Sequence, residues 1–111
     1  MNLFGFPKEM RLTRKREFEE VYRDGKRLKG TFITLYYLSG DTPPRLGISI
    51  SHALRGTVER NRIKRQIREF FRLNKGLFKG GTFVVGVNAK AKEKGGDEIR
   101  DELRRLVEMV E

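Results

Sequence analysis

Cysteine is absent from the 111-residue sequence, and His52 is its single histidine. Disulfide bonds and thiolate metal sites are therefore excluded, and no histidine pair or histidine-rich metal cluster can form within the chain. Glu17, Glu19 and Glu20 lie in a basic segment and lack the converging carboxylates that a two-metal site needs. We therefore expect neither catalytic residues nor a metal site in the protein.

Long apolar runs are missing as well. No stretch of about 18 apolar residues occurs, so a membrane-spanning helix is not expected. Residues 1–7 are apolar but shorter than the apolar core of a signal peptide. We expect a cytoplasmic protein without a membrane partner. Its length predicts one domain, residues 1–111, with one hydrophobic core.

Positive charge is what the sequence has in excess. The formal net charge is +10, and it is distributed unevenly. Residues 8–29 contain nine basic and five acidic residues, residues 55–72 contain seven and two, and residues 88–111 contain six and seven. A small protein with concentrated positive charge binds nucleic acid or an anionic membrane surface. Nucleic acid is favoured because nothing in the sequence resembles a lipid anchor.

Local patterns predict helices and strands in alternation. The first helix is expected to follow Thr13 as its N-cap and to end at Gly25. Within it, Phe18, Val21 and Tyr22 share one face. Strands are predicted at residues 31–38, 45–51 and 83–87, with a weaker signal for another at residues 27–29.

Two further helices are predicted, at about residues 58–73 and after residue 96. Asp97 is the expected N-cap of the last one. Its apolar residues recur at helical spacing: Ile99, Leu103, Leu106, Val107 and Val110. Its acidic residues, Glu102 among them, are interpreted as first-turn charges that favour the helix dipole. The strand–helix–strand piece at residues 45–87 predicts a parallel crossover.

The second predicted helix separates apolar from basic residues. At about 100° per residue, one arc contains Ile63, Ile67, Phe70 and Phe71. The opposite side carries Asn61, Arg62, Lys64, Arg65, Arg68 and Arg72, and Arg60 lies at the edge between the two. A solvated helix face usually mixes both signs of charge, but only Glu59 and Glu69 offset seven cations here. Because a guanidinium binds phosphate oxygens through two hydrogen bonds, we expect this side to contact RNA or DNA.

Residues 60–69 read R-N-R-I-K-R-Q-I-R-E and resemble the signature of the bacterial ribonuclease P protein subunit. Three further segments resemble the same family. Residues 6–12 are similar to its opening segment, residues 18–26 to its first helix and turn, and residues 45–51 to the strand before the basic helix. The resemblance covers about residues 6–87, and the closing helix matches in type only.

The resemblance implies an α/β fold, an α+β sandwich of the ribosomal protein S5 domain 2 type, in the order α-β-β-(β)-α-β-α. It implies a central mixed sheet and a left-handed βαβ crossover, where general rules favour a right-handed one. Members of the family assist the removal of the 5′ leader from precursor tRNA by a catalytic RNA. The implied partners are therefore ribonuclease P RNA and precursor tRNA, with Mg²⁺ bound mainly by the RNA and no obligate protein partner.

Two binding surfaces follow from the resemblance. The surface for the catalytic RNA is expected to comprise Arg55, Arg60, Asn61, Arg62, Lys64, Arg65, Arg68 and Arg72. The cleft for the single-stranded leader is expected to comprise Phe18, Tyr22, Ile33, Leu35, Ser49, His52 and Arg60. By their spacing alone, Phe18 and Tyr22 favour a core position. The resemblance implies that they are partly exposed and stack on bases.

The chain departs from the family pattern beside the expected cleft. His52 and Ala53 stand where two lysines are usual, Arg55-Gly56 reverses the common order, and Asn88 stands where a basic residue is common. Two or three charges on the leader side are therefore missing, and Arg55 is interpreted as replacing one of them.

Two other functions fit parts of this pattern. A ribosomal or ribosome-associated protein has a similar size and charge without a catalytic partnership. A free-standing endonuclease fits less well, because the sequence lacks the histidines and converging carboxylates that it needs. Rescue of leader cleavage by a bacterial ribonuclease P RNA at low Mg²⁺ separates these alternatives.

Overall fold

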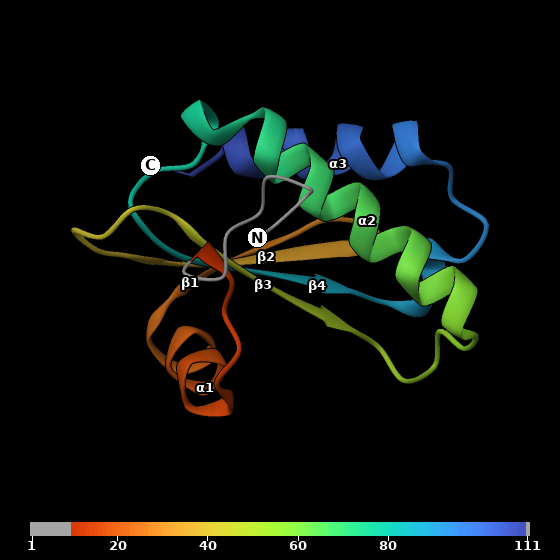
Figure 1. The fold of residues 1–111 in the computed structure, drawn as a ribbon, viewed down its shortest axis with the longest axis horizontal. Helices are drawn as coiled ribbons and strands as arrows, with labels where there is room; N and C mark the ends of the chain where they lie inside the picture. Colours follow the sequence, from red (N-terminus) through yellow and green to blue (C-terminus); the bar gives the residue numbers. More distant parts are fainter. Residues whose placement is uncertain (1–9, 111) are drawn as a thin grey trace, which may run out of the picture.

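A four-stranded sheet lies at the centre of the fold (Figure 1). The structure, a computed structural model, describes residues 10–110. The strands are β1 (Lys26–Lys29), β2 (Ile33–Ser39), β3 (Arg45–Ile50) and β4 (Gly81–Val87). The helices are α1 (Lys15–Asp24), α2 (Thr57–Leu73) and α3 (Gly96–Glu108), with short 3₁₀ turns at Lys75–Leu77 and Ala89–Ala91. The predicted succession of elements is confirmed, including the weakly indicated first strand.

The sheet is mixed, with the strand order β1-β2-β4-β3. β2 pairs antiparallel with β1 and with β4, whereas β3 pairs parallel with β4. Adjacent parallel strands need a crossover connection, and α2 supplies it between β3 and β4. The predicted parallel crossover is therefore confirmed, while its left hand stays a prediction.

Helices cover both faces of this sheet. Figure 1 shows α2 and α3 on one face and α1 on the other. The main core lies between the sheet and the α2–α3 layer, and a smaller apolar cluster of Leu12, Val21 and Val84 lies on the α1 side. Because both faces are covered, the central strands β2 and β4 carry apolar or aromatic residues on both sides, whereas the edge strand β1 is mostly exposed. No helix within residues 10–110 is long and apolar enough to cross a membrane.

Two predicted helix starts are wrong. α1 is preceded by Arg14 rather than Thr13, and Arg14 makes no side-chain capping bond. α3 is preceded by Gly95, whose N–H donates to the Glu98 carboxylate at 3.3 Å, so Asp97 lies inside the helix. The predicted end of α1 at Gly25 is confirmed. Of the opening segment at residues 6–12, positions 6–9 lie outside the described residues.

A buried carboxylate joins α3 to the start of β2. Glu102 is buried, and its Oε2 accepts the backbone N–H groups of Phe32 at 2.8 Å and Ile33 at 2.7 Å. Gly30 leaves room for this contact, because a Cβ there would lie 2.8 Å from Glu102 Oε2. The interpretation of Glu102 as a first-turn charge is therefore wrong. It lies in the middle of α3 and fixes the turn between β1 and β2.

Candidate nucleic-acid interface

The two sides of α2 are separated as the sequence predicts. Its apolar residues, Ile63, Ile67, Phe70 and Phe71, are all buried. We call the outward residues the α2 ridge: Asn61, Arg62, Lys64, Arg65, Arg68 and Arg72. Asn61, Arg65 and Arg68 are exposed, and the other three are half-buried. The helix thus docks by its apolar stripe and carries cations on its outer side.

The cations of the α2 ridge fall into two groups. Arg62 donates to Glu59 at 2.5 Å, and Arg72 donates to Glu69. These hydrogen bonds hold the pKa of each glutamate below its ordinary value. Lys64, Arg65 and Arg68, by contrast, have no hydrogen-bond or ion-pair partner among the described residues. This second group is therefore available to a polyanion without first breaking an internal ion pair.

Arg11 extends the positive surface beyond α2. It forms an isolated bridge with Leu46 at the edge of β3 and lies close enough to Arg68 to affect it. Desolvation, together with the neighbouring Arg11 charge, lowers the pKa of Arg68. The Nε atom of Arg11 is buried without a hydrogen-bond partner in the part of the chain that the structure describes. Local sequence patterns do not indicate that Arg11 and Arg68 are near each other, because the two residues are far apart in the chain.

Arg60 has a different role from the ridge. Its guanidinium donates to the carbonyl oxygens of Ser51 at 2.9 Å, Leu54 at 3.1 Å and Ile50 at 3.4 Å. The side chain therefore holds the loop between β3 and α2, where the structure also places His52 and Arg55 as exposed residues. Arg60 lies between the two predicted surfaces, and most of its donors are already directed at protein oxygens.

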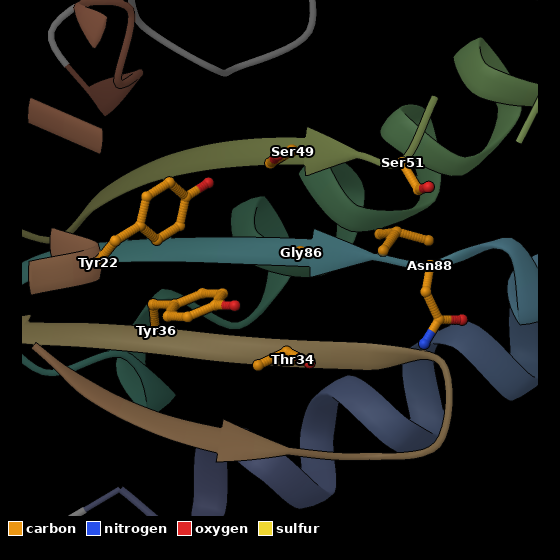
Figure 2. Close-up of a pocket in the computed structure, with 8 residues that line it drawn as sticks. Tyr22, Thr34, Tyr36, Ser49, Ser51, Gly86 and Asn88 are labelled. Atoms are coloured by element: carbon orange, nitrogen blue, oxygen red, sulfur yellow. The ribbon is translucent and has the colours of Figure 1, made fainter. Parts of the chain in front are cut away.

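A pocket of about 250 Å³ opens on the α1 side of the sheet (Figure 2). We call it the tyrosine pocket, and its lining consists of Tyr22, Thr34, Tyr36, Ser49, Ser51, Gly86, Val87 and Asn88. The Tyr22 and Tyr36 rings meet edge to face, with centroids 4.8 Å apart. Figure 2 shows the two tyrosines at one end and Ser51 with Asn88 at the other. The pocket therefore combines an aromatic end with an uncharged polar end.

The predicted cleft position of Ile33 and Leu35 is wrong. Their exposures are 1% and 0%, and both side chains belong to the main core beneath α2 and α3. Successive side chains of a strand point to opposite faces, so Thr34 and Tyr36 face the pocket instead. The resemblance implies the wrong face of β2 for the cleft, and the alternation along the strand does not identify the right one, because both faces carry large apolar or aromatic side chains.

Of the remaining predicted cleft residues, some line the tyrosine pocket and others lie outside it. Ser49 and Tyr22 line the tyrosine pocket, and Tyr22 is 42% exposed. Phe18 is half-buried and outside the lining, with its ring centroid 6.4 Å from that of Tyr22, so it supports the pocket from behind. His52 lies outside the lining as well.

Asn88 closes one end of the pocket rather than presenting a free amide. Its Nδ2 donates to the Thr31 carbonyl at 3.3 Å, and its Oδ1 accepts the Lys90 N–H at 2.9 Å. The first bond ties the end of β4 to the β1–β2 turn, and the second caps the 3₁₀ turn at Ala89–Ala91. Where the family commonly has a cation, this chain therefore has a cross-link between two loops.

A cationic helix ridge on one face of a mixed sheet, and an aromatic, uncharged pocket on the other face, define a small basic RNA-binding protein of the α+β class. The chain belongs to the ribonuclease P protein family: the family model described as Ribonuclease P matches residues 6–111. The resemblance carried by residues 60–69 is thereby confirmed.

Named relatives and solved structures agree with this family. The chain is 47% identical over 79 residues to the ribonuclease P protein component of Desulfotalea psychrophila, an alignment that covers 70% of this chain and 66% of the relative. It is 32% identical over 112 residues to that of Desulforapulum autotrophicum, covering 99% and 96%. The fold is similar to an RNase P protein mutant of Staphylococcus aureus, with a TM-score of 0.89, 27% identity and coverage of 98% and 97%. It is also similar to the Thermotoga maritima protein, with a TM-score of 0.81, 29% identity and coverage of 91% and 97%.

Proposed function

We propose that this chain binds ribonuclease P RNA through the α2 ridge and the single-stranded 5′ leader of precursor tRNA through the tyrosine pocket, and so assists removal of the leader in the cytoplasm. The observation that carries the proposal is the difference in charge and shape between the two surfaces. One is cationic and convex, whereas the other is uncharged, aromatic and hollow. The loop that Arg60 holds contributes Ser51 to the pocket and leads into α2, so it connects the elements that carry the two surfaces.

The α2 ridge suits the backbone of a folded RNA. Lys64, Arg65 and Arg68 project from a rigid helix without internal ion-pair partners among the described residues. Contacts of this kind give affinity with little sequence information. Each phosphate that they neutralise adds up to about 0.9 to the salt dependence of binding. The ridge is therefore assigned to assembly with the RNA subunit.

The tyrosine pocket suits an unpaired nucleotide of variable identity. Aromatic side chains stack on bases with an energy of about 1–3 kcal/mol per base and with little base preference. Tyr22 and Tyr36 supply the aromatic surface, while Ser49 and Ser51 supply hydroxyl groups at its side. A pocket with these properties accepts leaders of different sequence, which a general tRNA-processing enzyme requires.

We place the catalytic Mg²⁺ in the RNA subunit. Within residues 10–110, no group of three or more histidine, cysteine, aspartate or glutamate side chains could hold a metal ion. The cations of the α2 ridge would also repel a divalent cation at the surface that faces the RNA. The protein's own contribution is then to bind and orient its two RNA partners.

Reconstitution tests the proposal. Addition of this protein to a bacterial ribonuclease P RNA at low Mg²⁺ is expected to restore cleavage at the leader junction, whereas the protein without RNA is expected to leave precursor tRNA intact. A variant with Lys64, Arg65 and Arg68 changed to alanine tests the α2 ridge, and it should fail to restore leader cleavage at the same protein concentration. Equal rescue by this variant, or cleavage by the protein alone, would contradict the proposal. The reported matches do not support the alternative of a ribosomal protein.

A further inference from the structure

The edge strand β1 brings two cations onto the face of the sheet that contains the tyrosine pocket. Arg27 is paired with Tyr36 across the strands, and Lys29 is paired with Thr34. Directly opposite residues of an antiparallel pair project from the same face, with Cβ atoms about 4.5–5.5 Å apart. Tyr36 and Thr34 both line the pocket. Arg27 and Lys29 therefore border it on the side away from β3.

The other two residues of β1 point to the opposite face. Lys26 is paired with Tyr37, and Leu28 with Leu35, and both of these partners belong to the main core. Arg27 and Lys29 are exposed, and neither has an ion-pair or hydrogen-bond partner among the described residues. Their side chains are thus free to bind a ligand that lies over β2.

The opposite border of the pocket carries less available charge. On the β3 side the lining residues are Ser49 and Ser51, and the nearby guanidinium of Arg60 is directed at three backbone carbonyls. Asn88, at the end of the pocket, is uncharged and bonded within the protein. Apart from the exposed Arg55 in the β3–α2 loop, an RNA strand whose base enters the pocket therefore finds free cations along β1.

We propose that Arg27 and Lys29 bind successive phosphates of the single-stranded RNA whose base occupies the tyrosine pocket. The inference rests on the proposed function, because it assigns the path of the leader backbone across that site. Residues two apart on a strand are about 7 Å apart, which is comparable to the spacing of phosphates in an extended single strand. Figure 2 shows β1 running beside β2 along this border of the pocket. The competing explanation is that basic residues on an edge strand only prevent pairing with another sheet.

The experiment uses the reconstituted complex of protein and ribonuclease P RNA. Two dissociation constants of this complex are measured over a range of salt concentrations. One is for a precursor tRNA with a long leader, and the other is for the same tRNA without a leader. The variants are Arg27→Gln, Lys29→Gln and the double variant. Lys26→Gln is the matched control, since it removes one charge from the same strand but on the other face. Thermal unfolding of each variant verifies that the exposed edge still folds.

Each single variant is expected to lower the affinity for leader-bearing precursor tRNA by roughly two- to fivefold, which is the range for one exposed ion pair. The double variant should also reduce the salt slope by about 0.7 for each lost phosphate contact. Binding of leaderless tRNA and the behaviour of Lys26→Gln should not change. Unchanged leader affinity in the double variant, or an equal loss for both substrates, would overturn the inference. If the wild-type complex itself does not distinguish the two substrates, the proposed leader pocket fails instead.

Discussion

The ring of Phe18 lies directly on the backbone of Gly47. A Cβ added at Gly47 would be 2.7 Å from Phe18 Cζ and 2.8 Å from Cε1, closer than any real contact allows. This approach brings α1 close to the sheet at β3. Phe18 is also 6.4 Å from Tyr22 between ring centroids, and Tyr22 contacts Tyr36 edge to face, so the close packing at Gly47 lies next to the aromatic end of the tyrosine pocket.

Gly47→Ala is expected to destabilise the protein by about 1–3 kcal/mol, as overpacking of a core does. Denaturant unfolding measures the effect. The same substitution should be less destabilising in a Phe18→Ala background, because the ring that it strikes is gone. Gly76→Ala is the control, since an added Cβ there meets nothing within 4 Å. Additive effects of the two substitutions would contradict the contact as the cause.

Tyr36→Ala is expected to weaken binding of leader-bearing precursor tRNA by about 1–3 kcal/mol, the energy of one base stack. Phe18→Ala should act in the same direction, because it removes the support behind Tyr22. Neither variant should change the affinity for mature tRNA. Tyr37→Phe removes a hydroxyl from the opposite face of β2 and should have no effect on leader binding. Equal losses for precursor and mature tRNA would rule out a leader pocket.

Arg65→Ala should weaken assembly with ribonuclease P RNA and reduce its salt slope by up to about 0.9. Arg62→Ala is expected to act in the same direction but less strongly, because Glu59 already neutralises part of the Arg62 charge. Filter binding across a salt titration measures both quantities. Arg23→Ala, which removes a cation from α1, serves as the control. Wild-type affinity at every salt concentration in both ridge variants would exclude the ridge from the RNA contact.

Arg60→Ala is expected to reduce folding stability by about 1–3 kcal/mol, because buried carbonyl groups lose their donors. Its assembly with RNA should keep the wild-type salt slope, unlike that of Arg65→Ala. Leader binding should fall as well, since Ser51 both accepts from Arg60 and lines the pocket. A reduced salt slope with unchanged stability would show instead that Arg60 contacts a phosphate.

Acid should weaken the link between α1 and β3. Arg45 donates to Glu17 at 2.5 Å, and this hydrogen bond lowers the pKa of Glu17 below its ordinary 4.5. A lowered folded-state pKa gives stability that is present above pH 4.5 and is lost as pH falls through the folded value. The stability difference between wild type and Glu17→Gln should therefore shrink below that pH. A constant difference from pH 7 to pH 3 would contradict the role of this pair.

The sequence predicted the orientation of an element best where the spacing of apolar and polar residues distinguished its buried side from its exposed side. In α2, apolar and basic residues separate at helical spacing, and Ile63, Ile67, Arg65 and Arg68 lie on the predicted sides. In β2 the two faces are both apolar or aromatic, because helices cover the sheet on both sides. The alternation of Leu35 and Tyr36 was therefore visible, but the side facing the cleft was not.

Contacts between distant segments could not be predicted from local patterns. The charge of Arg11 acts on Arg68, and Glu102 accepts from the backbone of Phe32, across separations that composition and spacing do not report. The family resemblance implies that Arg60 contacts both the catalytic RNA and the leader. The three carbonyl groups that it contacts become neighbours only after β3 and α2 have formed a corner.

The carboxylate of Glu102 links the folding of the β1–β2 turn to the folding of α3. The amides of Phe32 and Ile33 find their acceptor in a helix about 70 residues later in the chain. In a nascent chain that has emerged only as far as β4, these amides have water rather than Glu102 as their acceptor, and the β1–β2 turn lacks its link to α3. The β1 border of the tyrosine pocket thus depends on α3, a helix that lies on the other face of the sheet, so removal of α3 should also disturb this border.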